Sequence, residues 1–280
     1  MLKALAYYSY ILAALSVALR LLEQSGYGSE TPRWPTIVVA ALFLLAGRLL
    51  TALADSRQQA GRDRRASALF ASLVDNDFSD EHVEPYALYL RPFSTTGRMI
   101  VSNPKMRWLP VLPSYFANEE TLEFETLLAE ALAPDLPLIA LGRPGEHIGA
   151  GRLAVADEEW QDVFQRLIQH ASWIVMIPND EGETRWEIEQ LVTQGLLHKT
   201  LFIMPPMLRF RQSDAADYWE KVRSGLAGLT LQLPRYNSAG QLFRLGRAGQ
   251  YYRGRHLPKL TLPLVRDRFA GLTTEPGKNG

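Results

Sequence analysis

The sequence predicts an α/β domain with a doubly wound, mainly parallel five-stranded sheet, preceded by an N-terminal two-helix transmembrane hairpin. Two long apolar stretches lie within the first 55 residues, and beyond residue 85 short apolar runs alternate with segments of helical periodicity. Strands that are apolar throughout are buried on both faces, and helices between them produce parallel crossovers. A chain of 280 residues is long enough for one such domain and an appendage.

Composition excludes several classes of function. The 30 basic and 30 acidic residues balance to a formal net charge of zero, so we expect no nucleic-acid partner. The absence of cysteine excludes disulfides, thiolate chemistry and cysteine-ligated metals. The five histidines show no ligand spacing, so no metal site is predicted and no cofactor is required.

The predicted membrane spans are residues 4–22 and 36–54. Each is about 19 residues, or roughly 28 Å as helix, which is close to the thickness of a hydrocarbon core. Arg20 and Arg48 interrupt them only near one end, where a long side chain reaches the interface. The alternative for the first span is a cleaved signal peptide, and the alternative for the second is a buried helix of a soluble protein.

Basic residues after the second span orient the predicted hairpin, which occupies residues 1–56. Arg57, Arg62, Arg64 and Arg65 follow it closely, and such clusters stay on the cytoplasmic side of a membrane. The sequence therefore predicts a multi-pass protein with cytoplasmic N- and C-termini and the lipid bilayer as a partner.

Residues 57–84 are predicted to form a basic juxtamembrane helix and linker, and residues 85–235 the α/β domain. The predicted strands are 86–93, 137–142, 172–178, 200–206 and 229–234, and the predicted helices are 122–133, 157–171, 185–197 and 213–228. Residues 236–280 are a basic C-terminal extension, for which we expect a hairpin at the sheet edge and a partly disordered end.

A ligand of such a sheet binds beyond the carboxyl ends of its strands, where helices begin. Three segments lie at that edge, at the ends of predicted strands: residues 91–93, 142–152 and 179–187. The second carries four glycines and two arginines, as a backbone approaching a phosphate requires. The alternative is that this segment is a flexible surface loop. The candidate ligand-binding residues are Arg91, Phe93, Gly142, Arg143, Gly145, Gly149, Arg152, Asp180 and Trp186.

Two acids in the stretch "GETRWEIEQL" are candidate catalytic residues, Glu187 and Glu189. We expect Glu187 in the first turn of a helix, where the dipole and free amides would keep its pKa low. Such an anion suits ribose hydroxyls and an oxocarbenium-like centre. The alternative is that both acids lie on the surface and that Trp186, instead of stacking on a base, belongs to the core.

Three segments carry a resemblance to a known family. "YALYLRPF" (86–93), "GRPGEHIGAGR" (142–152) and "RWEIEQL" (185–191) resemble, in order and content, motifs of the TIR-like superfamily over roughly residues 85–206. That superfamily includes signalling adaptors, NAD glycohydrolases and, more distantly, nucleoside deoxyribosyltransferases, all with a flavodoxin-like fold. The combination also resembles a group of bacterial membrane-anchored proteins, which implies the bacterial inner membrane.

The resemblance implies three functions. The first is cleavage of the N-glycosidic bond of NAD or a related nucleotide, with Glu187 facing the ribose and Glu189 as second choice. Arg91 and Arg143 would then hold phosphate, while Phe93 and Trp186 would stack on a ring. The second function is a non-catalytic signalling module that forms homo-oligomers through the TIR-like domain, and the third is a nucleotide sensor without turnover.

Overall fold

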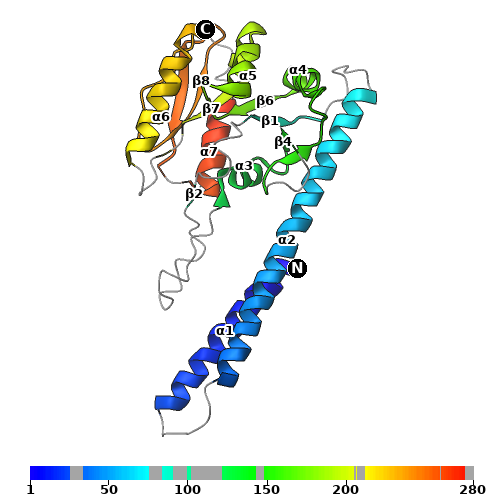
Figure 1. The fold of residues 1–280 in the computed structure, drawn as a ribbon, viewed down its shortest axis with the longest axis vertical. Coiled ribbons are helices and arrows are strands. Elements are labelled where there is room, and N and C mark those ends of the chain that lie inside the picture. Colours follow the sequence, from blue (N-terminus) through cyan, green and yellow to red (C-terminus); the bar gives the residue numbers. More distant parts are fainter. Residues whose placement is uncertain are drawn as a thin grey trace. The chain divides into compact units, whose positions relative to one another are not determined.

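The computed structural model describes residues 1–25, 34–75, 84–90, 100–101, 122–142, 148–204, 206, 212–258 and 260–274 (Figure 1). The chain divides into two compact units, Met1–Gly61 and Arg62–Gly280.

The first unit is an antiparallel pair of helices, α1 (Leu2–Ser25) and the N-terminal part of α2 (Trp34–Asp75). Small buried side chains recur at seven-residue spacing along their contact, at Ala6, Ala13, Ala40, Gly47 and Ala54. A Cβ atom on Gly47 would lie 2.7 Å from Cε1 of Tyr10, so a glycine is what lets the backbones approach. Lys3 Nζ, at the start of α1, forms an ion pair with Asp55 Oδ1 of α2 at 3.1 Å.

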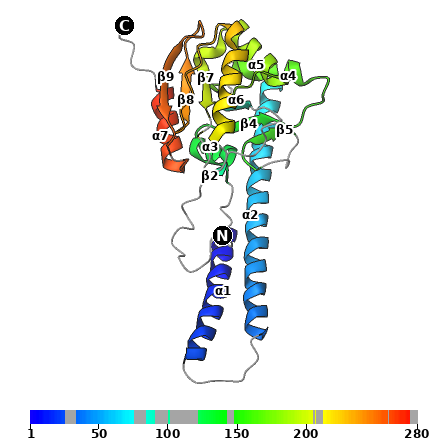
Figure 2. The ribbon, with the colours of Figure 1, turned by 60° about the vertical axis from the view of Figure 1, so that its left-hand side comes forward.

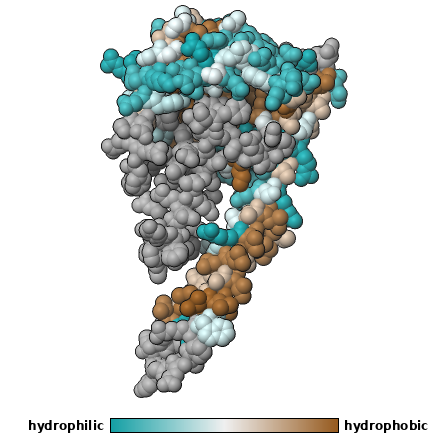
Figure 3. All heavy atoms as spheres, viewed as in Figure 1, coloured by the Kyte–Doolittle hydropathy of each residue, from teal (hydrophilic) through white to brown (hydrophobic). Residues whose placement is uncertain are grey.

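The outward surface of these two helices is apolar. Both are long and apolar enough to cross a membrane, as the sequence predicts. Leucines and valines along both helices are exposed, and Figure 3 shows this surface as a nearly continuous hydrophobic band. The exposed leucines, isoleucine and valines of this unit are Leu5, Leu12, Leu15, Val17, Leu19, Leu21, Ile37, Val38, Val39, Leu42, Leu44, Leu45, Leu49 and Leu53.

Helix α2 runs without interruption to Asp75, so the basic juxtamembrane helix expected within residues 57–84 is its last part. Its side chains Ala66, Leu69 and Leu73 are buried in a core cluster of the second unit.

The second unit contains a mixed seven-stranded sheet in the order β5-β4-β1-β6-β7-β8-β9. The five strands from β5 to β7 are parallel, and β8 and β9 are antiparallel. The strands are β1 (Ala87–Leu90), β4 (Leu138–Leu141), β5 (Gly151–Leu153), β6 (Trp173–Met176), β7 (Thr200–Met204), β8 (Gln241–Leu245) and β9 (Tyr251–His256). A separate antiparallel pair joins β2 (Ile100–Val101) to β3 (Leu122–Glu123).

Four of the five predicted strands are confirmed, and the fifth is wrong. Leu229 ends a short 3-10 helix, η5 (Ala227–Leu229), and Thr230 adopts a left-handed conformation with φ 61°. Leu231 and Leu233 are buried, but Gln232 N donates to Gly249 O at 2.8 Å, so this segment lies against the β8–β9 turn and adds no strand. The fifth parallel strand is instead β5, from the segment expected to be a glycine-rich loop.

The C-terminal segment supplies the hairpin β8–β9, which pairs antiparallel with β7 and makes the sheet mixed where the sequence predicted a mainly parallel five-stranded one. The segment continues into α7 (Leu262–Thr273), which packs against α3 (Phe124–Leu132) on one face of the sheet.

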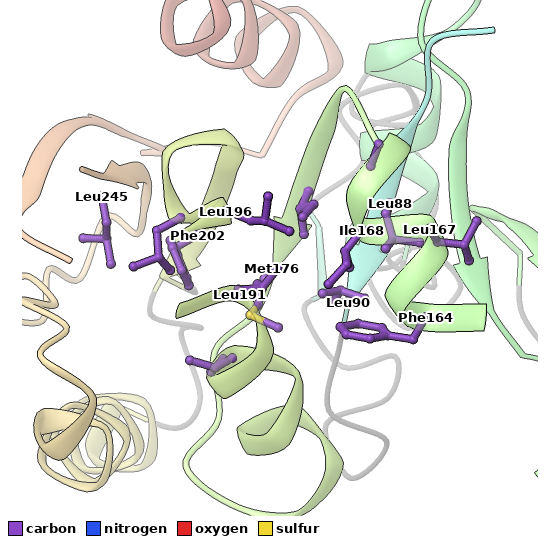
Figure 4. Close-up of a cluster of buried hydrophobic side chains, with 14 of the residues drawn as sticks. Leu88, Leu90, Phe164, Leu167, Ile168, Met176, Leu191, Leu196, Phe202 and Leu245 are labelled. Atoms are coloured by element: carbon purple, nitrogen blue, oxygen red, sulfur yellow. The ribbon is translucent and has the colours of Figure 1, made fainter. Parts of the chain in front are cut away.

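The other face of the sheet is covered by the end of α2 and three further helices: α4 (Trp160–His170), α5 (Gly182–Thr193) and α6 (Gln212–Gly225). In Figure 4, Phe164, Leu167 and Ile168 of α4 lie beside Leu88 and Leu90 of β1. A 3-10 helix, η4 (Leu196–Lys199), leads into β7. Both faces are therefore closed by helices, and ligand-accessible backbone is expected at the strand ends.

Candidate functional site

The carboxyl ends of β1 and β6 form a point where the chain leaves the sheet in opposite directions. These strands are neighbours in the sheet, but α3, which follows β1, covers one face, and α5, which follows β6, covers the other. Such a switch point is where open α/β sheets bind ligands. The predicted site residues Arg91, Phe93, Arg143 and Gly145 lie outside the described residues.

Glu187 lies in the second turn of α5, on the side of the helix that carries the buried residues Thr184, Ile188 and Leu191. Its Oε2 atom is buried and has no hydrogen-bond partner among the described residues, although the residue as a whole is only partly buried. Burial, and to a lesser degree the negative charge of Glu183, raises the pKa of the Glu187 carboxyl to about 8.

This result corrects the expected low pKa of Glu187. The helix begins at Gly182, earlier than predicted, so Glu183 occupies the first turn and Glu187 lies beyond the free amides. At neutral pH the folded protein therefore holds Glu187 mainly protonated. A buried carboxyl with a pKa near the working pH is the kind of group that acids and bases of active sites provide.

Trp186 is packed as a core side chain. Its ring centroid lies 5.0 Å from that of Trp160 and 5.3 Å from that of Phe164, both in α4. The first contact is edge-to-face and the second is tilted, and both hold the two helices together. The arrangement fits the alternative in which Trp186 belongs to the core rather than stacking on a base.

Glu189 and Asp180 face α6, away from Glu187. Arg185 Nε donates to Glu189 Oε1 at 3.0 Å, and Arg185 Nη1 donates to Gly225 O at 3.1 Å. The Asp180 carboxylate lies so close to Gly225 that a Cβ atom there would be 2.4 Å from its Oδ2. Glu189 therefore has a structural role, because it holds the arginine that links α5 to α6.

Tyr218 of α6 completes this contact. Its hydroxyl donates to Pro178 O at 3.0 Å, just after β6. Burial, followed by the charges of Asp180 and Glu181, raises the pKa of Tyr218 to about 12, so it stays neutral.

Arg152 is fully buried in an ion pair and is not available to a phosphate. Its Nη2 lies 2.5 Å from Oε1 of Glu125 in α3, and Ala150 N donates to the same oxygen at 2.9 Å. The backbone N of Arg152 donates to Asp63 Oδ1 in α2 at 2.8 Å. Because α3 and α5 cover opposite faces of the sheet, Arg152 and Glu187 do not converge.

The glycines of this segment serve the same packing. A Cβ atom on Gly149, whose φ is +150°, would lie 2.6 Å from Cγ of Glu125, and one on Gly151 would lie 2.5 Å from Arg62 O. Arg62 Nη1 also donates to Gly149 O at 2.9 Å. Gly142 ends β4, and its N donates to Leu153 O at 3.0 Å. The described residues 148–152 thus pack inside the protein, in contrast to both the flexible surface loop and the phosphate-binding loop considered from the sequence.

Sequence patterns did not point to Asp63 and Glu125, the two carboxylates that hold this segment. The one available signal was an acid at a core-facing position of the apolar helix "FETLLAEAL". Among the described residues, no group of acids and histidines is arranged to hold a metal ion.

No protein-family model, curated protein or solved structure matches this chain. The class defined by the structure is an α/β protein with a mixed seven-stranded sheet and two long apolar N-terminal helices.

Replacing Glu125 with alanine is expected to lower the free energy of unfolding by about 3–5 kcal/mol, because it leaves the Arg152 charge buried and unpaired. Chemical denaturation of the full chain in detergent measures this. Glu189→Ala, which breaks a half-exposed pair, should cost less than about 1 kcal/mol. Equal effects of the two substitutions would contradict the structural role of Arg152.

The pKa of Glu187 predicts a pH-dependent stability. The folded pKa of about 8 exceeds the ordinary glutamate pKa of 4.5, so the stabilisation is complete below pH 4.5 and is lost as the pH rises through 8. Glu187→Gln mimics the neutral form of the side chain, so its stability does not fall from this cause over this pH range. Its Tm should exceed that of the unsubstituted protein increasingly from pH 5 to pH 9, by about 2–4 °C for each kcal/mol. Glu158→Gln, an exposed control, should show a constant difference, and a constant difference for Glu187→Gln would refute the buried carboxyl.

Proposed function

We propose that this chain is a multi-pass membrane protein in which α1 and the apolar part of α2 span the bilayer. The observation that carries the proposal is the exposed apolar surface of both helices. The helices contact each other through small residues, and large aliphatic side chains face outward. Water would oppose such an arrangement, whereas lipid tails stabilise it.

The α/β unit lies in the cytoplasm in this proposal, together with both chain ends. Arg57, Arg62, Arg64 and Arg65 support that orientation. The bacterial inner membrane follows from the resemblance to bacterial membrane-anchored proteins.

Labelling of engineered cysteines tests the anchor, since the chain has none of its own. In intact bacterial cells, a membrane-impermeant maleimide should label Ser29→Cys, which lies between the two helices in the sequence. Asp217→Cys, exposed on α6, should be labelled only after permeabilisation. Labelling of both positions in intact cells, or extraction of the protein by alkaline carbonate, would refute the anchor.

The proposed fold type is TIR-like. The four confirmed strands lie in the order second, first, third, fourth (β4-β1-β6-β7), which is the order of the flavodoxin-like pattern. The antiparallel hairpin β8–β9 is an addition to that pattern.

The proposed activity is cleavage of the N-glycosidic bond of NAD or a related nucleotide, with Glu187 as the acid–base group. Its buried, unpartnered carboxyl next to the switch point supports this assignment. A pyridinium ring beside Glu187 would favour its ionised form. The carboxylate would then stabilise positive charge at ribose C1′ and accept a proton from the attacking water as neutral nicotinamide departs.

The test is nicotinamide release from NAD by the full chain in nanodiscs, measured by chromatography. Because free Glu187 is protonated below pH 8, kcat/KM should rise by roughly tenfold per pH unit below 8 and level off above it. Glu187→Gln should lower kcat/KM by about 10²–10⁴-fold. Glu189→Gln should stay within about threefold, given its ion pair with Arg185. If Glu187→Gln leaves kcat/KM for nicotinamide release unchanged, Glu187 takes no part in the reaction.

A non-catalytic signalling module is the second candidate. It is favoured by the structural roles of Trp186, Gly149 and Arg152, which remove three residues from the predicted nucleotide site. No turnover at any pH, together with concentration-dependent assembly, would support it. Saturable nucleotide binding without either result would indicate a sensor.

A further inference from the structure

Positive charge is concentrated in the C-terminal part of the chain. Residues 235–274 contain seven arginines and one lysine but a single acid, Asp267, in a chain whose formal net charge is zero. This excess is therefore local and is balanced by acids elsewhere in the sequence.

Some of these arginines are committed to the fold. Arg244 donates to Leu272 O at 2.7 Å and to His198 O at 2.6 Å, with its guanidinium 4.8 Å from the Trp173 ring centroid. Arg266 donates to Ala131 O at 3.1 Å. These side chains join α7 and β8 to neighbouring elements and are not available to a partner.

Three arginines of the β8–β9 hairpin have no hydrogen-bond or ion-pair partner among the described residues, and we call them the basic edge: Arg247, Arg253 and Arg255. Arg247 lies in the turn between β8 and β9, and the other two lie on β9, the outermost strand of the sheet. Figure 2 shows β9 at the side of the sheet opposite β5 and α4.

Two tyrosines lie on the same strand. Tyr251 is 41% exposed and Tyr252 is 52% exposed. Among the described residues of the α/β unit, the other large apolar side chains that are exposed are Val74 and Ile148. Arginine guanidinium groups pair with phosphate, and tyrosine is favoured at the interface between lipid and water. Tyr252 lies beside the Arg244 guanidinium, and Arg253 and Arg255 pair across the strand with Arg244 and Leu242, so these three residues share one face of the hairpin. Tyr251 stacks on Phe243 on the other face.

We propose that the basic edge docks on the phosphate groups of anionic phospholipids. The inference rests on the proposed membrane anchor, which supplies the surface. Only eight positions separate Ala54 from Arg62, the first residue of the α/β unit, so the tether keeps the unit near any bilayer that holds the helices. Tethering raises the effective concentration of the surface, so a few weak contacts suffice for docking.

Charged side chains on an outer strand also discourage pairing with other strands. That role predicts no dependence on lipid. An acidic protein segment would need the same charges, so the test includes that outcome.

The experiment uses the full chain with one engineered cysteine, Ala248→Cys, in the exposed β8–β9 turn. A fluorophore there is quenched by spin-labelled headgroups in nanodiscs of phosphatidylcholine alone or with phosphatidylglycerol. We expect at least about twofold stronger quenching with phosphatidylglycerol, and loss of the difference at high salt, since each basic residue near an anionic surface favours binding about fivefold. A reference label at Gln161→Cys, exposed on α4, should show no such increase.

Arg253→Glu with Arg255→Glu should abolish the lipid dependence, whereas the matched pair Arg253→Lys and Arg255→Lys should keep it. Retention of the protein in phosphatidylcholine nanodiscs after a carbonate wash scores the anchor separately. If the protein is retained but phosphatidylglycerol does not change the quenching of its label, docking is refuted and the anchor is not. If the protein is washed out, both the docking and the anchor are refuted. Loss of a high-mass complex on charge reversal, without lipid dependence, would assign the edge to an acidic protein and overturn the proposal.

Discussion

The ion pair between Arg152 and Glu125 is the interaction on which the arrangement of the α/β unit depends. It joins β5 to α3, while the backbone of Arg152 is held by Asp63 of α2. Two opposite charges can be buried only when each satisfies the other, so the geometry of these three elements is tightly constrained. Gly149 and Gly151 make that constraint possible, because a side chain at either position would collide with Glu125 or with the backbone of Arg62.

This packing explains why the fold was more predictable than the site. Runs such as "WIVM" and "TLFIM" are apolar throughout, and burial on both faces leaves them few alternatives to central parallel strands. The segment 229–234, in which Thr230 and Gln232 alternate with leucines, lies outside the sheet, because Thr230 turns the chain and Gln232 bonds to the β8–β9 turn. Which of two apolar runs pairs with β7 depends on tertiary contacts that a sequence pattern does not contain.

The candidate site was predicted from residue types that serve structural purposes equally well. A glycine-rich segment with arginine suits a phosphate, but here its described part satisfies buried charges inside the protein. Glu187 was selected for its position in the sequence, yet its chemistry depends on where α5 begins. A start at Gly182 moves it from the solvated first turn to a buried one and reverses the direction of its pKa shift.

The hairpin β8–β9 has a consequence for the limits of the folding unit. Every residue of β7 is buried, and β8 pairs with its residues Leu201–Met204. A chain that ended before the hairpin would leave β7 as an open and largely apolar edge strand with unsatisfied amides and carbonyls, which is a template for intermolecular strand addition. The C-terminal residues are thus not an accessory appended to a finished domain. The smallest autonomous version of this domain must extend at least through α7.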